Sequence, residues 1–176
     1  MSKDNMSEKT IHFIITGGTF DKHYDEIRGE LTFKYTHLPE ILDFVRCTVP
    51  LTFEINQLTD SLDMDDSARG RILTSSMTSE ARRIIIIHGT DTMTETAALI
   101  GQQALDKTIV LTGAMVPYSI SRSDALFNLG AAVSAVQLLS AGCYICMNGW
   151  VFPWKGTAKD KTSGTFKGPD LTKADL

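Results

Sequence analysis

Short apolar runs rich in β-branched residues alternate with segments of helical periodicity along most of the chain. The clearest run is 84–87, whose four consecutive isoleucines indicate a strand buried on both faces of a parallel sheet. Apolar side chains then recur at helical spacing up to Leu105, which predicts an amphipathic helix. Similar runs predict further strands at 11–15, 52–58, 107–111 and 143–147, and helices at 37–46, 67–82 and 126–139.

This alternation of strands and helices predicts an α/β fold, with a doubly wound, mostly parallel sheet and helices on both faces. The 176 residues are enough for one domain and too few for two of ordinary size. We therefore expect a single domain over 1–176, with a polar N-terminal tail at 1–10. The periodicity is lost near the end, and glycine and lysine punctuate a C-terminal tail at about 155–176 that we expect to be loop-like.

Small polar side chains follow several of the predicted strands. Thr19 follows the first strand in TGGTFD, Asp60 and Ser61 follow the second, and Gly89, Thr90 and Asp91 follow the isoleucine run in HGTDTM. The carboxyl ends of parallel strands share one edge of the sheet, so these turns are expected to form one pocket. TGGT alone is equally explained as a tight turn, and carboxylates after the second strand are explained as helix caps.

Other kinds of site are disfavoured by the spacing of the residues that they need. G-x-G-x-x-G, GK[ST] and G-x-S-x-G are absent, and the histidines have no metal-ligand spacing, so we expect no cofactor and no metal. Cys143 and Cys146 imitate a C-x-x-C motif, but side chains three apart on a strand face opposite sides of a sheet. His88 is expected to organise the turn that follows it.

Composition and charge indicate which partners and which cellular compartment to expect. A net charge of −4 provides no basic field for nucleic acid, and no apolar run approaches the ~20 residues of a membrane span. The polar N-terminus lacks the apolar region of a signal peptide, and the odd count of three cysteines fits a reducing compartment. We expect a cytoplasmic protein that binds neither nucleic acid nor membrane.

Four motifs together resemble the bacterial asparaginase/glutaminase family. They are TGGTF at 16–20, SLDM at 61–64 with Asp60 ahead of it, HGTDTM at 88–93 and TGAMVP at 112–117, and SDALFNL at 123–129 and MNG at 147–149 continue the likeness. The order and spacing are those of the family over about residues 11–155. TGGTFDKHY and the GELTF that follows resemble the short form of bacterial L-asparaginase, which has only the N-terminal domain.

The resemblance implies hydrolysis of L-asparagine to L-aspartate and ammonia, with no cofactor. It implies that Thr19 attacks the side-chain amide, with Tyr24 beside it as its proton acceptor. Thr90 is implied either to deliver the attack or to activate water in the second half of the reaction. For the substrate, it implies that Asp91 pairs with the α-ammonium group and that Ser61 holds the α-carboxylate, with Asp60 and Gly89 in the same pocket and Ala114 among the backbone donors to the oxyanion.

Two features of the long family members have no direct counterpart. Their lysine on the helix after TGAM bonds to the second threonine, whereas AVSAVQLLSAG contains no lysine, so Lys155 or Lys159 would have to replace it. Their neighbouring subunit also contributes an acidic residue from a C-terminal domain. A module that binds asparagine or aspartate without turnover, and an amidase for glutamine or another amide, therefore stay open. We expect a homodimer, from the family's habit and from two aromatic residues expected to be exposed, Trp150 and Trp154.

Overall fold

A computed structural model describes residues 9–176, and positions 1–8 of the expected polar tail lie outside the described residues. The main sheet has six strands in the order β4 (Leu51–Thr59), β1 (Ile11–Gly17), β5 (Arg83–Ile87), β6 (Thr108–Thr112), β7 (Gly142–Met147) and β8 (Trp150–Pro153). The first five are parallel, and β8 is an antiparallel edge strand. The predicted α/β fold with a mostly parallel sheet is therefore confirmed.

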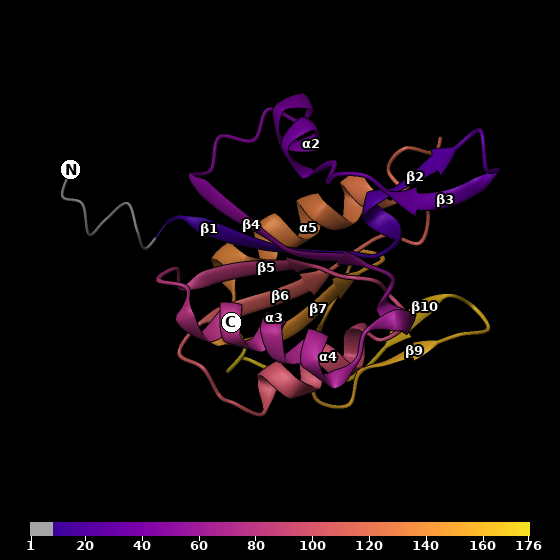
Figure 1. Cartoon of the computed structure of the whole chain (residues 1–176). Coiled ribbons are helices and arrows are strands. Elements are labelled where there is room, and N and C mark those ends of the chain that lie inside the picture. Colours follow the sequence, from indigo (N-terminus) through magenta and orange to yellow (C-terminus); the bar gives the residue numbers. More distant parts are fainter. Residues whose placement is uncertain (1–8) are drawn as a thin grey trace.

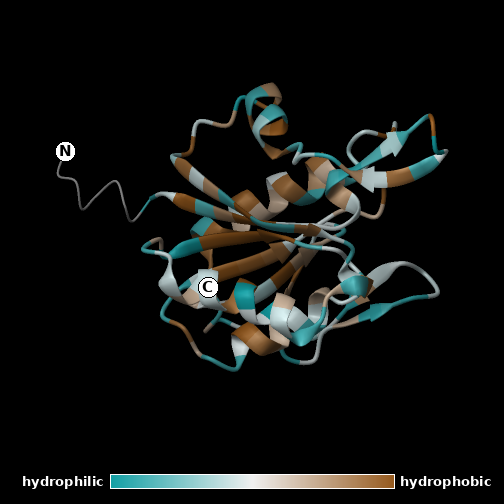
Figure 2. Cartoon of the chain, viewed as in Figure 1, coloured by the Kyte–Doolittle hydropathy of each residue, from teal (hydrophilic) through white to brown (hydrophobic). Residues whose placement is uncertain are grey.

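Helices cover both faces of this sheet (Figure 1). The short helix α2 (Leu38–Phe44) and the long helix α5 (Ala125–Leu138) pack on one face, and α3 (Asp66–Thr78) and α4 (Met93–Gly101) pack on the other. Figure 2 shows that the strands between the two helical layers carry the most hydrophobic residues. The doubly wound arrangement follows from this pattern, because the inner strands β1, β5, β6 and β7 bury both of their faces.

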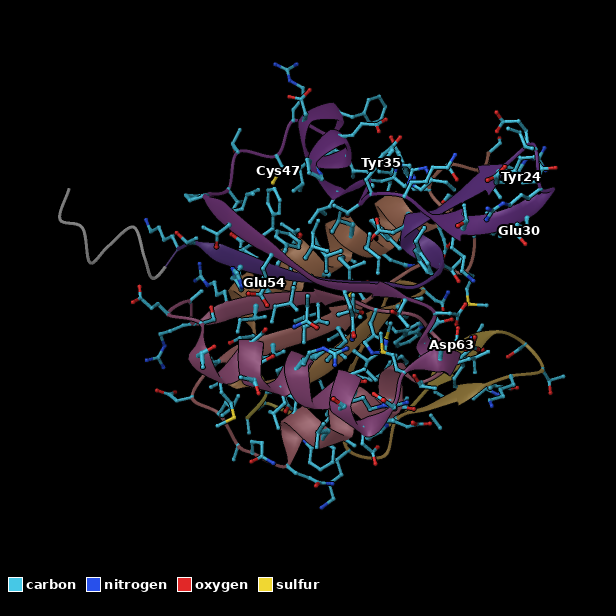
Figure 3. All side chains as sticks on the ribbon, viewed as in Figure 1. Tyr24, Glu30, Tyr35, Cys47, Glu54 and Asp63 are labelled. Carbon is cyan, nitrogen blue, oxygen red and sulfur yellow. The ribbon has the colours of Figure 1, made fainter. Side chains whose placement is uncertain are left out.

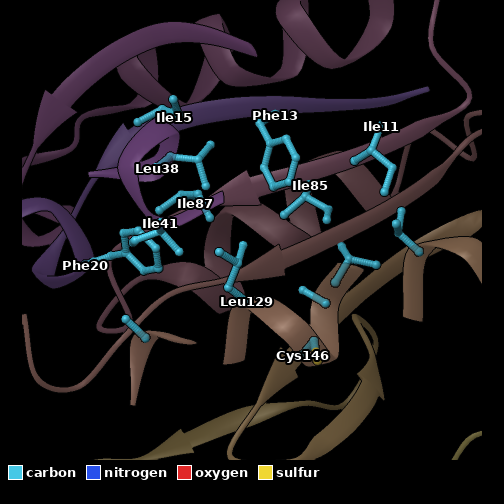
Figure 4. Packing of buried hydrophobic residues seen from close by; sticks show 14 of the residues in the cluster. Ile11, Phe13, Ile15, Phe20, Leu38, Ile41, Ile85, Ile87, Leu129 and Cys146 are labelled. Carbon is cyan, nitrogen blue, oxygen red and sulfur yellow. The ribbon is translucent and has the colours of Figure 1, made fainter. Parts of the chain in front are cut away.

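Strand β5 illustrates how the isoleucine run forms the core. Ile85 and Ile87 belong to the cluster on the α5 side, where Phe13 and Leu129 pack beside them (Figure 4). Ile84 and Ile86 point the other way, into the cluster under α3 and α4. All four isoleucines are fully buried. Each stabilises the fold by about 1.5–3 kcal/mol relative to an exposed side chain.

Two β-hairpins stand apart from the main sheet. One consists of β2 (Lys22–Asp25) and β3 (Glu30–Phe33), and the other of β9 (Ala158–Asp160) and β10 (Thr165–Lys167). Both project at the end of the sheet where the parallel strands finish (Figure 1). The second hairpin corrects the expectation of a loop-like tail. Its strands have only three residues each, too few for an alternating pattern to register.

The two cysteines of β7 confirm the strand argument. Cys143 lies in the cluster under α4, and Cys146 lies in the cluster on the α5 side. Burial raises the pKa of the Cys143 thiol far above its ordinary value and that of Cys146 to about 12. Among residues 9–176, no group of histidine, cysteine or acidic side chains is placed to hold a metal ion. None of the helices within the same range has the length and hydrophobicity to cross a membrane.

Candidate active site

The strand order reverses its direction of growth at β1, which lies between β4 and β5. At such a switch point the loops that leave the two adjacent strands diverge, and a crevice opens at the carboxyl ends of the strands. The ends of β1 and β5 are also tied together, because the Thr16 hydroxyl donates to the Ile87 carbonyl oxygen at 2.8 Å. The candidate site is therefore expected in the turns that follow these two strands.

Glycines allow these turns to touch one another. Gly18, at φ 69°, lies so close to the next turn that an added Cβ would be 2.4 Å from Gly89 Cα. A Cβ on Gly89 would in turn lie 2.5 Å from the Ser61 hydroxyl oxygen, and one on Gly113 would lie 2.2 Å from the His88 carbonyl oxygen. The turns after β1, β4, β5 and β6 therefore meet at one edge of the sheet, as the sequence predicts.

A lysine from the second hairpin completes this cluster. The Lys159 ammonium group donates to the Thr90 hydroxyl at 2.8 Å and to the Asp91 carboxylate at 2.7 Å. Its side chain is only 8% exposed, so the pair is partly shielded from water. Of the two candidates raised from the sequence, Lys159 occupies this position, whereas Lys155 is exposed. The lysine therefore comes from a hairpin much later in the chain than the helix after TGAM.

Ser61 presents a buried hydroxyl group to the site. Its side chain is 1% exposed, and its oxygen has no hydrogen bond within residues 9–176. The backbone of Ser61 is held by the Thr92 hydroxyl, which donates to its carbonyl oxygen at 2.8 Å. Asp60 precedes it, caps the 3₁₀ turn Ser61–Asp63 through Leu62 N at 3.1 Å and forms an ion pair with Lys22. A buried polar atom without a partner is costly, and a ligand that bonded to Ser61 would remove that cost.

His88 holds the turn after β5. Its Nδ1 lies 2.8 Å from the Gly89 carbonyl oxygen, so Nδ1 carries the proton, and Nε2, 2.9 Å from the Thr96 hydroxyl, accepts from it. Complete burial lowers the pKa of His88 to about 4, against a smaller upward effect of the bond to Gly89. The imidazole is therefore neutral at pH 7 and organises the backbone, as expected from the sequence.

Thr19 and Tyr24 belong to the segment after β1, whose hairpin β2–β3 projects separately from the hairpin β9–β10 that carries Lys159 (Figure 1). Thr19 is half-buried in the 3₁₀ turn Thr19–Asp21, and its hydroxyl makes no hydrogen bond to the described residues. Tyr24 is 56% exposed on the projecting β2–β3 hairpin (Figure 3). No hydrogen bond joins the two side chains within residues 9–176. The structure thus brings Thr19 to the edge of the site but leaves Tyr24 outside contact.

The turn after β6 is shaped by two residues that the sequence reasoning did not single out. The Asp124 carboxylate accepts from Met115 N and Val116 N at 3.0 Å each. Asn128 Nδ2 donates to the Gly113 carbonyl oxygen at 3.0 Å. The sequence feature that could have identified them is the SDALFNL motif, which contains both residues. These bonds occupy two N–H groups of the turn and fix the backbone around buried Ala114.

Comparisons with known proteins find relatives over most of the chain. The family described as "Asparaginase, N-terminal" matches residues 10–173. The chain is 30% identical to L-asparaginase 1 of Escherichia coli K12 over 138 residues, which cover 70% of the chain and 39% of that protein. It is also 30% identical to a component of the glutamyl-tRNA(Gln) amidotransferase of Methanosphaera stadtmanae over 150 residues, 81% of the chain and 34% of that protein.

Among solved structures, a probable cytoplasmic L-asparaginase from Campylobacter jejuni superimposes with a TM-score of 0.80 at 26% identity. That match covers 93% of this chain and 54% of the other. The chain therefore spans roughly a third to a half of the length of these relatives. The match over nearly all of its residues, on the fold and cluster described above, places this chain in the asparaginase family, to whose N-terminal domain it corresponds.

Proposed function

We propose that the protein is an amidohydrolase that converts L-asparagine to L-aspartate and ammonia through a threonine nucleophile. Family membership supports amide hydrolysis. The observation that carries the proposal is the lysine that bonds to both Thr90 and Asp91, in a cluster that also holds the Ser61 hydroxyl, which has no hydrogen bond to residues 9–176. Catalysis needs an activated hydroxyl and a place to hold the substrate, and this cluster supplies both.

In the first step the Thr19 oxygen attacks the side-chain carbonyl carbon of the substrate. Its proton passes by way of Tyr24 to the amide nitrogen, which leaves as ammonia, and an acyl-enzyme remains on Thr19. This step requires the β2–β3 hairpin to bring Tyr24 inward, because more than half of that side chain is exposed on the projecting hairpin. The N–H group of Ala114 is the proposed donor to the oxyanion, since the next two N–H groups of the turn, those of Met115 and Val116, already donate to Asp124.

In the second step Thr90 orients a water molecule against the ester carbonyl. Lys159 donates to the Thr90 oxygen and holds that hydroxyl in position for the water. The Asp91 carboxylate, 2.7 Å away, pairs with the Lys159 ammonium group and keeps it in place. The ester bond breaks, and the proton that the water gives up passes to the Thr19 oxygen as aspartate leaves. Ser61 holds the substrate α-carboxylate, and Asp91 also attracts its α-ammonium group.

The two threonines can be separated by the kinetics of ammonia release. We expect Thr90→Val to give a rapid burst of ammonia close to the enzyme concentration, followed by a slow steady state, because the acyl-enzyme forms but hydrolyses slowly. We expect Thr19→Ala to give no burst. The reverse pattern would exchange the two roles, and unchanged rates in both variants would reject the proposed function.

A second candidate is an amidase for another carboxamide, favoured by the match to the amidotransferase component over 81% of the chain. Both candidate enzymes hydrolyse a carboxamide, and they differ in the substrate groups on either side of that amide. Ammonia release should be compared for L-asparagine, L-glutamine and asparagine within a short capped peptide. Ammonia release from the peptide alone would show that the substrate is a peptide amide and not free L-asparagine. Tight binding of L-aspartate with no ammonia from any of the three would instead identify a binding module.

We also propose that the protein acts as a homodimer in the cytoplasm. Trp150 is largely exposed at the edge strand β8, which suits an interface. Trp154 no longer supports the dimer, because it packs against Gly101 and is half-buried, which corrects the expectation of an exposed ring. Sedimentation at micromolar concentration tests the dimer, and a single species of 19.4 kDa would reject it.

A further inference from the structure

Lys22 connects three parts of the site. Its N–H donates to the Thr19 carbonyl oxygen and closes the turn that carries the proposed nucleophile. Its carbonyl oxygen accepts from the Ser119 hydroxyl at 2.8 Å, on the loop after β6. Its ammonium group pairs with the Asp60 carboxylate and lies 5.9 Å from the centre of the Phe33 ring.

Asp60 transmits this contact to the substrate-binding turn. One carboxylate oxygen accepts from Lys22, and the other accepts from Leu62 N at 3.1 Å. The backbone carbonyl of Asp60 also accepts from Asp63 N at 3.0 Å, so the residue closes the turn on which Ser61 lies. Both partners of the ion pair are mostly shielded, with side-chain exposures of 20% for Lys22 and 27% for Asp60. Such a pair is screened less by solvent than a fully exposed one.

The turns that Lys22 joins have different proposed tasks. Thr19 attacks the amide carbon, and Ser61 holds the α-carboxylate at the other end of the substrate. The separation of these two turns therefore sets the side-chain length that fits, which is one methylene longer in glutamine than in asparagine. Backbone contact at the glycines holds the turns together on the sheet side. The ion pair is the side-chain link between them beyond the sheet.

We propose that Lys22, acting through Asp60, is a positioning residue that fixes the separation of the Thr19 and Ser61 turns and thereby determines selection for substrate length. This inference rests on the proposed function. It concerns the ratio of kcat/KM for two homologous amides, so it is tested separately from activity itself. One methylene changes such ratios by about 10-fold to 200-fold.

The experiment uses single and double variants of the full chain. Lys22→Met retains the length of the side chain and its apolar contact with Phe33 but removes the charge. Asp60→Asn retains an oxygen that can cap Leu62 N, because asparagine is as good a cap as aspartate, but removes the negative charge. Lys22→Arg retains the positive charge. The control is Arg28→Met, because Arg28 pairs with Glu30 on the same hairpin, where the side chains are 70% and 58% exposed.

We expect Lys22→Met and Asp60→Asn each to lower the asparagine-to-glutamine ratio of kcat/KM by about 5-fold or more, mainly through a higher KM for asparagine. The double variant should resemble either single variant, since each breaks the same link. Lys22→Arg should recover most of the ratio, and Arg28→Met should leave it unchanged. Thermal unfolding of each variant identifies any that fails to fold, and Asp60→Asn keeps the test available if Lys22→Met is lost.

Two results overturn the inference while leaving the proposed function intact. One is an active Lys22→Met enzyme with an unchanged ratio. The other is an equal loss in kcat for both amides at an unchanged ratio, which would indicate a general structural role. If the unmodified protein releases no ammonia from either amide, the proposed function fails instead.

Discussion

Replacement of Asp21 by asparagine should stabilise the protein at alkaline pH. Asp21 is completely buried two residues after Thr19, where Oδ1 accepts from the Thr36 hydroxyl and from His37 N at 3.0 Å each. The other carboxylate oxygen has no partner among residues 9–176. Burial raises the pKa of Asp21 from 3.8 to about 6, although these two hydrogen bonds and the charge of His23 oppose the rise.

The pKa shift determines the sign and the size of the effect. A carboxyl group whose pKa is higher in the folded state binds its proton more tightly there, so stability falls as pH rises between the unfolded and folded pKa values. With one pKa unit equal to about 1.4 kcal/mol, the cost of the ionised form is about 1 kcal/mol at pH 4.5 and about 3 kcal/mol at pH 8. Asparagine has the same shape and no charge, so it removes this cost. Any cost of the new amide group itself does not depend on pH.

The measurement is urea unfolding of both proteins at pH 4.5 and pH 8. The stability of Asp21→Asn relative to the unmodified protein should rise by about 2 kcal/mol between the two pH values. Asp43→Asn, at an exposed position on α2, controls for the removal of one negative charge. A difference that is the same at both pH values would refute the reasoning, because it would mean that burial imposes no charge-dependent cost on Asp21.

Further predictions concern the site and the thiols. Lys159→Met should lower kcat by about 100-fold or more, because the Thr90 hydroxyl that orients the water loses its donor, and thermal unfolding checks that the variant folds; a full-rate enzyme would remove Lys159 from the mechanism. Gly89→Ala should raise KM more than Ser61→Ala does, because its methyl group would lie 2.5 Å from the Ser61 hydroxyl oxygen, and substrate saturation curves compare the two. A thiol reagent should modify Cys47 in the native protein and the two buried cysteines of β7 only in denaturant; fast labelling of all three would contradict their burial.

The parts of the fold that the sequence predicts are those with strong periodicity. Strand β5 is an unbroken apolar run, and α5 is a long alanine-rich apolar segment, so both are found within about two residues of their observed ends. The strand ends then place Thr19, Ser61 and Thr90 at one edge, since parallel topology requires it. The remaining detail depends on non-local packing, which no local pattern encodes.

The position of Lys159 could not be predicted from local sequence patterns. It was a candidate only because the family lysine had no counterpart after TGAM, and its own surroundings are a polar, glycine-rich stretch without periodicity. Its position depends on the pairing of two three-residue strands, and a Cβ on Gly164 between them would lie 3.1 Å from Met115 Cε. The Lys22–Asp60 ion pair could not be predicted from the sequence either, because its partners are 38 residues apart and the folding of the sheet brings them together.

The hairpin β9–β10 forms a separate two-stranded sheet. Isolated hairpins of this length are marginal in water, and this one is held to the domain by the buried side chain of Phe166. Brief local melting of the segment therefore costs less free energy than unfolding of the domain. Each such excursion withdraws the Lys159 ammonium group from Thr90 and leaves the six-stranded sheet intact. On heating, the turnover rate should therefore fall at a temperature several degrees below that at which the circular dichroism signal of the domain changes.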